Sequence, residues 1–401
     1  MRISLPWRFK NKGSQNTEIF ENARNKTILG GTLNMGKKLV VLMVLLAMLL
    51  SVTGAFAEGQ QEEAGTGEAS AAGAAGLTKV VEAKMASEEI EGDFMTVWGN
   101  NYADYMREET DGMYDLTVYP YGSLGDTRDI NELAQLGVVE YVFSDFAWIS
   151  AFVPEAQVLS LHYIWPKERM PEVLEWVVNN GDIMPFMEEA FRRNGLVPLG
   201  IVYEGWQWVT SKPKAVTLED LEGLKTRVMG SKLLVEDYRA YGMSPTPMSY
   251  GEVYSGLQTG LIDAQVNPLF ADYSMKFYEV TNYFTQMWAE PFLGIPTVNM
   301  QHFDTLPDET QALMKAYFKD NIMAAADWID NRNANDRAKI EEEKPEIVWT
   351  EWDDEEVAKA KEMAQTVWED EYPGIAGEGA VEALEILLED IENAKDALGV
   401  E

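Results

Sequence analysis

The sequence "YDLTVYP" at residues 114–120 is followed by "TRDINELAQLG" at 127–137 and by "VEYVFSD" at 139–145. The first and third stretches have the pattern of strands. The middle stretch has the apolar spacing of a helix and ends at Gly137, a residue type that often follows a helix. This order predicts a βαβ unit with parallel strands.

Similar patterns recur along the chain. Further strands are predicted at 196–211, 224–229 and 262–268, with helical segments such as 251–260 between them. Such crossovers favour mostly parallel sheets. Near the C-terminus, apolar residues repeat at helical spacing and predict an amphipathic helix that packs on a domain: Leu384, Leu387, Leu388 and Ile391. The fold class is therefore α/β, and 401 residues with 46% hydrophobic composition favour two domains over one.

The N-terminal residues 1–57 have the features of an export signal. Lys37 and Lys38 precede an unbroken apolar run at 39–50, and the small-residue ending Ala55-Phe56-Ala57 follows. We expect cleavage after Ala57 and a periplasmic location. A membrane anchor is the alternative, but the run is shorter than the roughly 20 residues that span a bilayer.

The basic region of this signal begins at Met35, not at residue 1. We therefore expect residues 1–34 to be an upstream extension and Met35 to be the true start. Residues 58–77 begin with "EGQQEEAGTG", which is small, polar and without periodicity, and we expect a flexible linker there. The folded part should begin at about residue 78.

Acidic residues dominate the exported chain. Removing residues 1–57 leaves 24 Lys or Arg against 65 Asp or Glu, a formal charge of −41. This charge argues against binding nucleic acid. It also means that a binding site for an anion must be a local positive spot in an acidic protein.

Common catalytic and metal-binding patterns are missing from the sequence. There is no cysteine, and no G-x-S-x-G, Walker A, G-x-G-x-x-G or H-E-x-x-H motif occurs. His162 and His302 stand alone in apolar contexts, so we expect both to be structural. The acidic runs at 340–346 and 351–356 lack the spacing of a calcium loop and are predicted to be solvated helix ends. We expect no catalytic residue, cofactor or metal.

The arginine in "LKTRV" at 224–228 has no obvious partner in the sequence. Leu224 and Val228 indicate that this strand faces a core, and a buried guanidinium needs a partner that offsets its desolvation. Arg227 is therefore a candidate for contact with a bound ligand.

The residues around Arg227 resemble one family of transport proteins. The stretch "LEDLEGLKTRVMGSKLLVEDYRAYGMSPTPMSYGEVYSGLQTGLIDAQVNPLFADYSMKFYEV" at 218–280 is similar to the substrate-binding proteins of tripartite ATP-independent periplasmic (TRAP) transporters, of the dicarboxylate-binding (DctP) type. The family pattern is matched at these positions: Gly223, Lys225, Arg227, Pro245, Pro247, Met248, Glu252, Val253, Tyr254, Leu257, Gln258, Gly260, Asp263, Asn267 and Pro268. A looser resemblance covers nearly all of the exported chain.

The resemblance implies a two-lobed periplasmic binding protein fold with a hinge and a ligand cleft between the lobes. We place lobe 1 at 78–204 and 293–332, and lobe 2 at 205–292 and 333–401. The implied role is to capture a small organic anion and to deliver it to the small and large membrane subunits of a TRAP transporter. We expect a monomer.

The resemblance also implies roles for three residues. The family arginine at the position of Arg227 forks onto the ligand carboxylate, a contact that lysine cannot reproduce. Asn267 matches an asparagine that meets the same ligand, and Tyr250 takes the place of an aromatic residue lying against it. Structural roles stay open: an internal ion pair for Arg227, a turn cap before Pro268 for Asn267, and a core position for Tyr250.

Gln207 is a departure from the family pattern. The family commonly has a second arginine in a Gly-Phe-Arg segment, where this chain has "GWQW" at 205–208. A second ligand carboxylate would lack its best counter-charge, which favours a monocarboxylate with a cyclic, aromatic or apolar body. The other predicted ligand-binding residues are Asp145, Trp148, Trp206 and Trp288. Two alternatives stay open: a receptor that presents its ligand to a sensor kinase, and a secreted enzyme with a carboxylate dyad.

Overall fold

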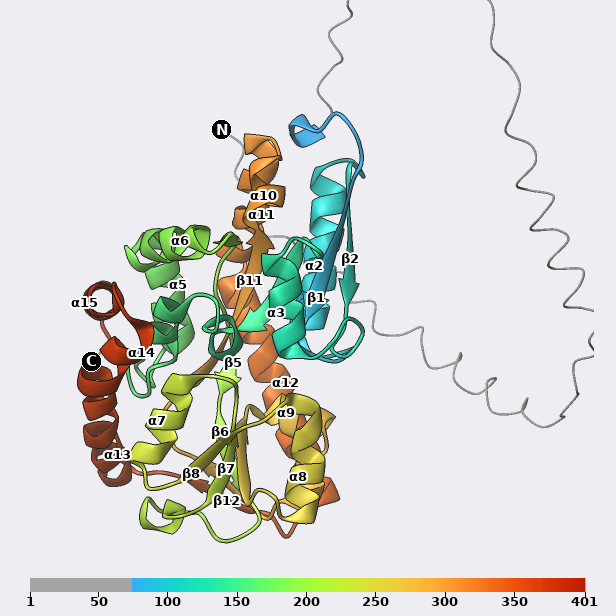
Figure 1. Cartoon of the computed structure of the whole chain (residues 1–401). Coiled ribbons are helices and arrows are strands. Elements are labelled where there is room, and N and C mark those ends of the chain that lie inside the picture. The colour runs from blue at the N-terminus through green and yellow to red at the C-terminus, as the bar shows by residue number, and fades with distance from the viewer. Residues whose placement is uncertain (1–73, 401) are drawn as a thin grey trace, which may run out of the picture. The chain divides into compact units, whose positions relative to one another are not determined.

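Two six-stranded sheets form the framework of the computed structural model, which describes residues 74–400 (Figure 1). The first sheet has the order β2-β1-β3-β11-β4, and β5 also pairs with β11. Its strands are β1 (Val81–Ser87), β2 (Tyr114–Tyr119), β3 (Tyr141–Asp145), β4 (Leu196–Pro198), β5 (Val202–Trp206) and β11 (Pro291–Asn299). The second sheet has the order β12-β10-β6-β9-β7-β8. Its strands are β6 (Trp208–Ser211), β7 (Lys225–Val228), β8 (Ser244–Pro247), β9 (Ala264–Asn267), β10 (Tyr283–Gln286) and β12 (Val348–Glu351).

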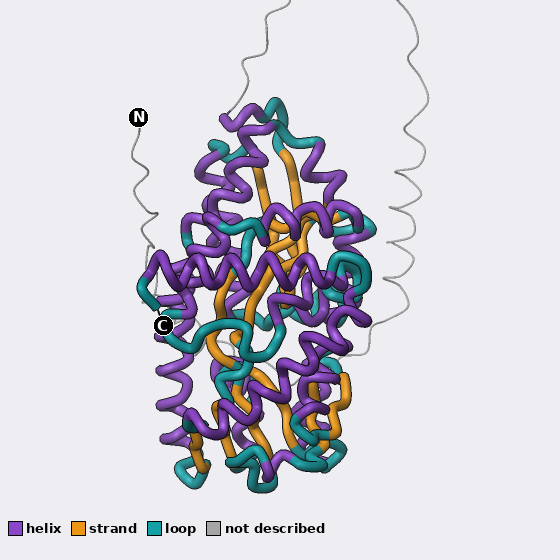
Figure 2. The backbone as a smooth tube through the Cα atoms, turned by 90° about the vertical axis from the view of Figure 1, so that its left-hand side faces the viewer, coloured by secondary structure: helices purple, strands orange, loops and turns teal. Residues whose placement is uncertain are grey.

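Helices surround both groups of strands (Figure 2). The α-helices are α2 (Phe94–Glu109), α3 (Thr127–Gln135), α4 (Phe146–Ile149), α5 (Met170–Asn180), α6 (Ile183–Arg193), α7 (Lys232–Ala240), α8 (Val253–Thr259), α9 (Leu269–Ser274), α10 (Met300–Asp304), α11 (Asp308–Asp320), α12 (Ile322–Glu343), α13 (Asp354–Thr366), α14 (Tyr372–Ala376) and α15 (Ala380–Leu398). The short 3₁₀ or π elements are η1 (Ala74–Gly76), η2 (Pro154–Ser160), η3 (Glu219–Leu221), η4 (Tyr250–Glu252), η5 (Phe277–Val280) and η6 (Val367–Glu371). Within residues 74–400, none of these helices is long and apolar enough to span a membrane.

The predicted βαβ unit is present as β2, α3 and β3. Asp126 caps α3, because its side chain accepts hydrogen bonds from the backbone N–H groups of Arg128 (3.1 Å) and Asp129 (3.3 Å). Gly137 follows the helix with φ +70°, a conformation that glycine adopts without strain. The sequence pattern did not predict that β1 lies between β2 and β3, in parallel with both.

The α/β class is confirmed, and both sheets are mixed: two of the five strand pairs are parallel in the first sheet and three of the five, with β10–β12 among them, in the second. In the first sheet β11 runs antiparallel to β3, β4 and β5. In the second sheet β6 runs antiparallel to β9 and β10, while β7 is parallel to β8 and β9. Both β6 and β11 enter directly from the other sheet, β6 after Gln207 and β11 after residues 287–290. They reverse direction because no helical crossover precedes them.

The chain thus connects the two sheets at three places. Two are the short segments at Gln207 and at 287–290, and the third is the long helix α12, which contacts β5 and α9 before the chain enters β12 (Figure 1). All described residues fall within one compact unit. The lobe boundaries stated above therefore stay a prediction. We refer below to the half built on the first sheet and the half built on the second.

The C-terminal helix α15 is amphipathic, as predicted. Leu387 and Ile391 are buried, whereas Leu388 is 38% exposed, so one member of the predicted apolar face is turned outward. The helix packs on α5, α6 and η2, which belong to the first half.

The export signal and residues 58–73 of the predicted linker lie outside the described residues. The last residues of that linker, Ala74–Gly76, form η1 against α11, and Leu77 is buried. The ordered chain therefore begins slightly before residue 78.

Both histidines have structural partners, as predicted. The His302 Nε2 atom lies 2.7 Å from the Tyr114 hydroxyl, and His162 Nδ1 lies 3.0 Å from the Tyr241 hydroxyl. Burial lowers the pKa of each imidazole, which favours the neutral form. Within the described residues, no three or more His, Cys, Asp or Glu side chains are grouped to hold a metal ion.

Candidate functional site

A pocket lies between the two sheets and takes residues from both. The first half contributes Glu88 and Glu89, directly after β1, and Phe292 of β11. The second half contributes Arg227, Met229, Tyr250, Asn267, Phe270 and Ala271. The cavity measures about 20 Å³, which is room for about one water molecule. An organic ligand therefore needs the surrounding side chains or the two halves to move apart.

Arg227 is the cation of this pocket. Only 1% of the residue is exposed, and its Nε donates a hydrogen bond to the Met248 carbonyl (3.0 Å). Its buried Nη1 has no acceptor among the described residues, and no described carboxylate lies within ion-pair distance of the guanidinium. Burial lowers the pKa of Arg227, while Asp145 and other nearby groups act in the opposite direction. The internal ion pair that stood as the alternative for Arg227 is therefore absent here.

Two buried carboxyl groups, those of Glu88 and Asp145, act electrostatically on this guanidinium. Glu88 Oε2 accepts hydrogen bonds from the Ser144 hydroxyl (2.7 Å) and from the Asp145 backbone N–H (2.8 Å). Asp145 Oδ1 accepts from the Trp148 N–H (2.8 Å), while Oδ2 has no partner among residues 74–400. Burial raises the pKa of Asp145 to about 7, Glu290 adds to this rise, and Arg227 opposes it. Burial and Asp145 raise the pKa of Glu88 as well. Asp145 thus acts on Arg227 from beside the pocket and does not line it.

A second group of acids surrounds Glu89. Its Oε2 accepts a hydrogen bond from the Met95 N–H (2.6 Å), and burial with nearby Asp93 raises its pKa to about 8. Glu204 of β5 is fully buried, and apart from the Glu89 carboxyl group its carboxyl oxygens have no hydrogen-bond partner in the described chain. Burial and the nearby charge of Glu89 raise the pKa of Glu204. Gly294 of β11 makes room for this carboxyl, because a Cβ there would lie 2.3 Å from Glu204 Oε1.

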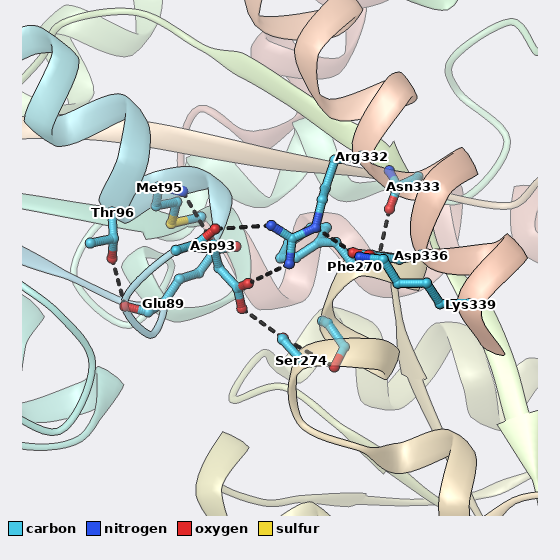
Figure 3. Close-up of polar contacts among 12 residues, drawn as sticks. Glu89, Asp93, Met95, Thr96, Phe270, Ser274, Arg332, Asn333, Asp336 and Lys339 are labelled. Carbon is cyan, nitrogen blue, oxygen red and sulfur yellow. Dashed lines mark hydrogen bonds and ion pairs between the residues drawn. The ribbon is translucent and has the colours of Figure 1, made fainter. Parts of the chain in front are cut away.

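Arg332 of α12 connects this acidic group to the second half (Figure 3). Its guanidinium donates to the Gly92 carbonyl (3.0 Å), lies 3.3 Å from Asp93 and also pairs with Asp336. The Asp93 carboxyl accepts a hydrogen bond from Ser274 (2.7 Å). Burial raises the pKa of Asp93 to about 6, against the effects of Ser274 and Arg332. Because Arg332 is held by these partners, it does not provide a second free cation for a ligand.

Asn267 and Tyr250 line the pocket, as predicted. Asn267 ends β9, and its side-chain N–H₂ donates to the Gln265 side-chain carbonyl. Tyr250 meets Tyr121 of the first half edge to face, with ring centroids 5.8 Å apart, and its buried hydroxyl lies beside Ser274. Both side chains keep polar groups available to a ligand.

The other predicted contacts lie beside the pocket and not on its wall. Gln207 donates to Glu290 (2.6 Å), which joins two of the segments that connect the sheets. Trp206 and Trp288 meet edge to face at 5.7 Å, and the Lys167 ammonium lies 4.2 Å from the Trp288 ring centroid. Trp148 packs so closely on the second half that a Cβ on Gly230 would lie 2.4 Å from its ring. These four predicted residues, Gln207, Trp206, Trp288 and Trp148, lie at the junction between the halves.

Hydrogen bonds join the two halves around the pocket. The Gly251 N–H donates to the Tyr121 hydroxyl (3.2 Å), and the Ser249 hydroxyl donates to Asp126 (3.2 Å). On another side, the Ser231 hydroxyl donates to the Gln157 side-chain carbonyl (2.8 Å). The conformation described is therefore one in which the halves meet.

Sequence reasoning missed six lining residues: Glu88, Glu89, Met229, Phe270, Ala271 and Phe292. The two glutamates carried a usable signal, because an acidic pair directly after an apolar strand has no reason to be buried unless it has a polar role. The apolar residues carried none, since core and pocket walls use the same side chains.

Taken together, these features define a solute-binding protein whose pocket forms where two halves meet. Residues 90–373 match the family described as bacterial extracellular solute-binding protein, family 7 (DctP), and the chain belongs to this family. Its members are substrate-binding proteins of TRAP transporters, and their role is not enzymatic. The carboxylate-dyad enzyme considered above is thereby set aside.

Relatives at 30% identity or above extend the comparison. The ectoine/5-hydroxyectoine-binding periplasmic protein UehA of Ruegeria pomeroyi is 34% identical over 288 residues, which is 71% of this chain and 83% of UehA. The ectoine-binding periplasmic protein TeaA of Halomonas elongata is 30% identical over 309 residues, 77% of this chain and 89% of TeaA. The solved structure of the ectoine-binding protein of the Halomonas elongata TeaABC TRAP transporter superposes with a TM-score of 0.73 at 30% identity, covering 78% of this chain and all of that one. The two-lobed α/β fold is confirmed.

Proposed function

We propose that this chain captures a small cyclic monocarboxylate that also carries a positive charge, and that it delivers this zwitterion to the membrane subunits of a TRAP transporter. The observation that carries the proposal is the charge arrangement of the pocket. A buried guanidinium with an unused donor faces the same cavity as two buried carboxyl groups from the other half.

The carboxylate of the ligand binds Arg227. A guanidinium binds a carboxylate through two parallel hydrogen bonds, and such a pair strengthens when water is excluded. A single arginine lines the described part of the pocket, and Arg332 is held by Asp93, Asp336 and Gly92. The pocket can therefore pair with only one ligand carboxylate.

The cationic part of the ligand lies against Glu88 and Glu89. In the absence of a cation, burial raises the pKa of Glu89 to about 8, so the group is mostly protonated at neutral pH. A cation placed beside it stabilises the ionised form and so releases a proton. The similarity to the ectoine-binding proteins UehA and TeaA supports this assignment, because ectoine joins a carboxylate to a cyclic amidinium in one molecule.

The flat body of the ligand lies between apolar side chains. Tyr250, Phe270, Phe292 and Met229 line the pocket, and side chains of this kind accept a small ring while the polar groups fix its orientation. Entry requires the halves to separate about the segments at Gln207 and 287–290, and closing restores the hydrogen bonds that join them. We further infer that the protein acts as a monomer in the periplasm, with lobes divided as stated above.

Calorimetric titration of the mature chain tests this function. The ligand panel is ectoine, 5-hydroxyectoine, cyclohexanecarboxylate, succinate and glucuronate. The two ectoines are expected to bind most tightly and succinate most weakly. Tightest binding to succinate would contradict the single-carboxylate pocket, and no binding by any member would contradict Arg227 as the anion site. Native mass spectrometry of protein purified without refolding adds an independent identification of any co-purified solute.

A further inference from the structure

A second cavity, larger than the central pocket, lies beside the C-terminal helices. It measures about 240 Å³ and shares no lining residue with the central pocket. Its walls are the loop at 163–166, residues of α13 and η6, and one face of α15. A cavity of roughly 150 Å³ accepts benzene, so this one has room for a ring with a short chain.

Aromatic and aliphatic side chains form the inner surface of this cavity. Tyr163, Trp165 and Trp368 are nearly buried, and each polar atom of the three is already bonded to the protein. Tyr163 donates to the Met287 carbonyl (3.1 Å), Trp165 to the Leu159 carbonyl (2.9 Å) and Trp368 to the His162 carbonyl (3.0 Å). Their rings are thus fixed in place, and only ring faces and edges are available to an occupant. Leu388 completes this surface and explains why an apolar residue of α15 is 38% exposed.

Two lysines stand at the edge of the cavity. Lys395 pairs with Glu392 (3.1 Å), while Lys361 has no ion pair within residues 74–400. The lining therefore has two cations and one anion, in an exported chain with a formal charge of −41. Such a local reversal of charge favours an anionic occupant.

The cavity also joins the two halves of the molecule. Helix α13 and η6 pack on α7 of the second half, whereas α15 packs on α5 and α6 of the first half. The Tyr163 N–H donates to the Ala289 carbonyl (2.6 Å), within a segment that connects the sheets. Tyr163 (φ +62°) and Trp288 (φ +57°) both adopt left-handed backbone conformations, which are uncommon and costly for aromatic residues. The cavity floor is thus attached to the segment 287–290 that connects the two sheets.

The geometry points to a second binding site in this cavity, for a small organic anion with a flat apolar body. The ring lies on Trp165, Trp368 and Leu388, and the carboxylate lies between Lys361 and Lys395. This site differs from the central pocket in its chemistry, since Lys361 is exposed, Lys395 is partly exposed and no buried carboxyl group lines it. It therefore requires no positive charge on its ligand, and it does not depend on the proposed function.

Calorimetry with 4-phenylbutyrate tests this site in the mature protein. The double variant Lys361→Gln/Lys395→Gln is expected to weaken binding about tenfold, as two partly exposed charge contacts are lost. The matched control is Lys79→Gln/Lys319→Gln, which makes the same charge change at exposed lysines outside both cavities. The neutral amide, 4-phenylbutanamide, is expected to bind the original protein about tenfold more weakly than the acid.

Two further variants separate this site from the central pocket. Arg227→Ala removes the central cation, so the 4-phenylbutyrate binding that this variant keeps occurs outside the central pocket, and we expect it to be kept. Leu388→Trp fills the second cavity from its surface and is expected to abolish binding without changing charge. The proposal is overturned if 4-phenylbutyrate does not bind, if the lysine pair and its control behave alike, or if Arg227→Ala rather than Leu388→Trp abolishes binding.

Discussion

The two halves of this protein bring opposite charges to the central pocket. The second half contributes a guanidinium that is 1% exposed and has an unused donor, together with the amide of Asn267 and the hydroxyl of Tyr250. The first half contributes Glu88 and Glu89, whose pKa values burial raises. Among the described residues, neither the guanidinium nor the two glutamates have an ion-pair partner, so a ligand with both signs can pair with Arg227 and stabilise the ionised form of the glutamates when the halves meet.

The largest expected loss of ligand affinity comes from changing Arg227, the cation that the second half contributes. Arg227→Lys keeps the charge but loses the two-point contact with a carboxylate, and we expect ectoine binding to weaken by about 2–5 kcal/mol, roughly 30-fold or more. Calorimetry measures the change. Arg239→Lys is the matched control, because Arg239 lies on the exposed side of α7 and pairs with Glu236 there. Equal affinities for the original protein and Arg227→Lys would remove Arg227 from the site.

Glu89 tests the opposite side of the pocket. Glu89→Gln keeps the shape and removes the charge, so we expect a loss on the order of 10- to 100-fold for ectoine. Binding of cyclohexanecarboxylate, which has no cation, should be unchanged or tighter. The exposed Glu82→Gln on β1, the strand that precedes Glu89, is the control. If Glu89→Gln weakened the binding of ectoine and of cyclohexanecarboxylate to the same extent, Glu89 would maintain the shape of the pocket and would not contact a cation.

The dependence of binding on pH follows from the same residue. The ordinary glutamate pKa is 4.5, and burial raises that of Glu89 to about 8, so the unliganded protein holds a proton there at neutral pH. A bound cation favours the ionised form, and affinity for ectoine should therefore rise as pH increases, by roughly tenfold between pH 6.5 and 7.5. Titrations in buffers of different ionisation enthalpy should detect about one released proton. In Glu89→Gln the rise should disappear.

Folding stability should change with pH in the opposite direction. A raised carboxyl pKa means that the folded chain holds more protons than the unfolded chain between pH 4.5 and about 8. The free energy of unfolding of the unliganded protein therefore falls as pH rises through this window. Thermal unfolding scans measure this fall, and Glu204→Gln, which removes a buried carboxyl group beside Glu89 whose pKa burial raises, should reduce it.

The smallest expected change in ligand affinity concerns the tryptophans at the junction between the halves. Trp206 and Trp288 were predicted to touch the ligand, but they pack on each other beside the pocket, and Lys167 lies over the Trp288 ring. Trp288→Phe should therefore change ectoine affinity by only about twofold. A loss of ectoine affinity comparable to that of Glu89→Gln would mean that Trp288 contacts the ligand.

The sequence predicted the pocket residues that the second half of the molecule contributes better than those from the first half. Arg227, Asn267 and Tyr250 lie within one continuous stretch whose spacing is specific, so their positions follow from the chain itself. Glu88 and Glu89 reach the pocket only because β1 pairs between β2 and β3 and so ends beside Asp145. No local pattern encodes that pairing.

The fold shows the same contrast. The βαβ unit and α15 are local features with clear periodicity, and both were predicted. The antiparallel strands β6 and β11 depend on where the chain passes between sheets, which periodicity does not indicate. The single stretch predicted at 196–211 is divided among β4, β5 and β6, and its residues belong to two different sheets.

A comparison of two ligands that differ chiefly in the cationic group tests the central claim most directly. Ectoine and cyclohexanecarboxylate each have one carboxylate on a six-membered ring, and only ectoine carries a positive charge. Calorimetric titration of the mature chain with both, at a pH near 7.5, should give at least about tenfold tighter binding of ectoine, and Glu89→Gln should remove this preference. Equal or tighter binding of cyclohexanecarboxylate by the original protein would contradict a pocket built for opposite charges.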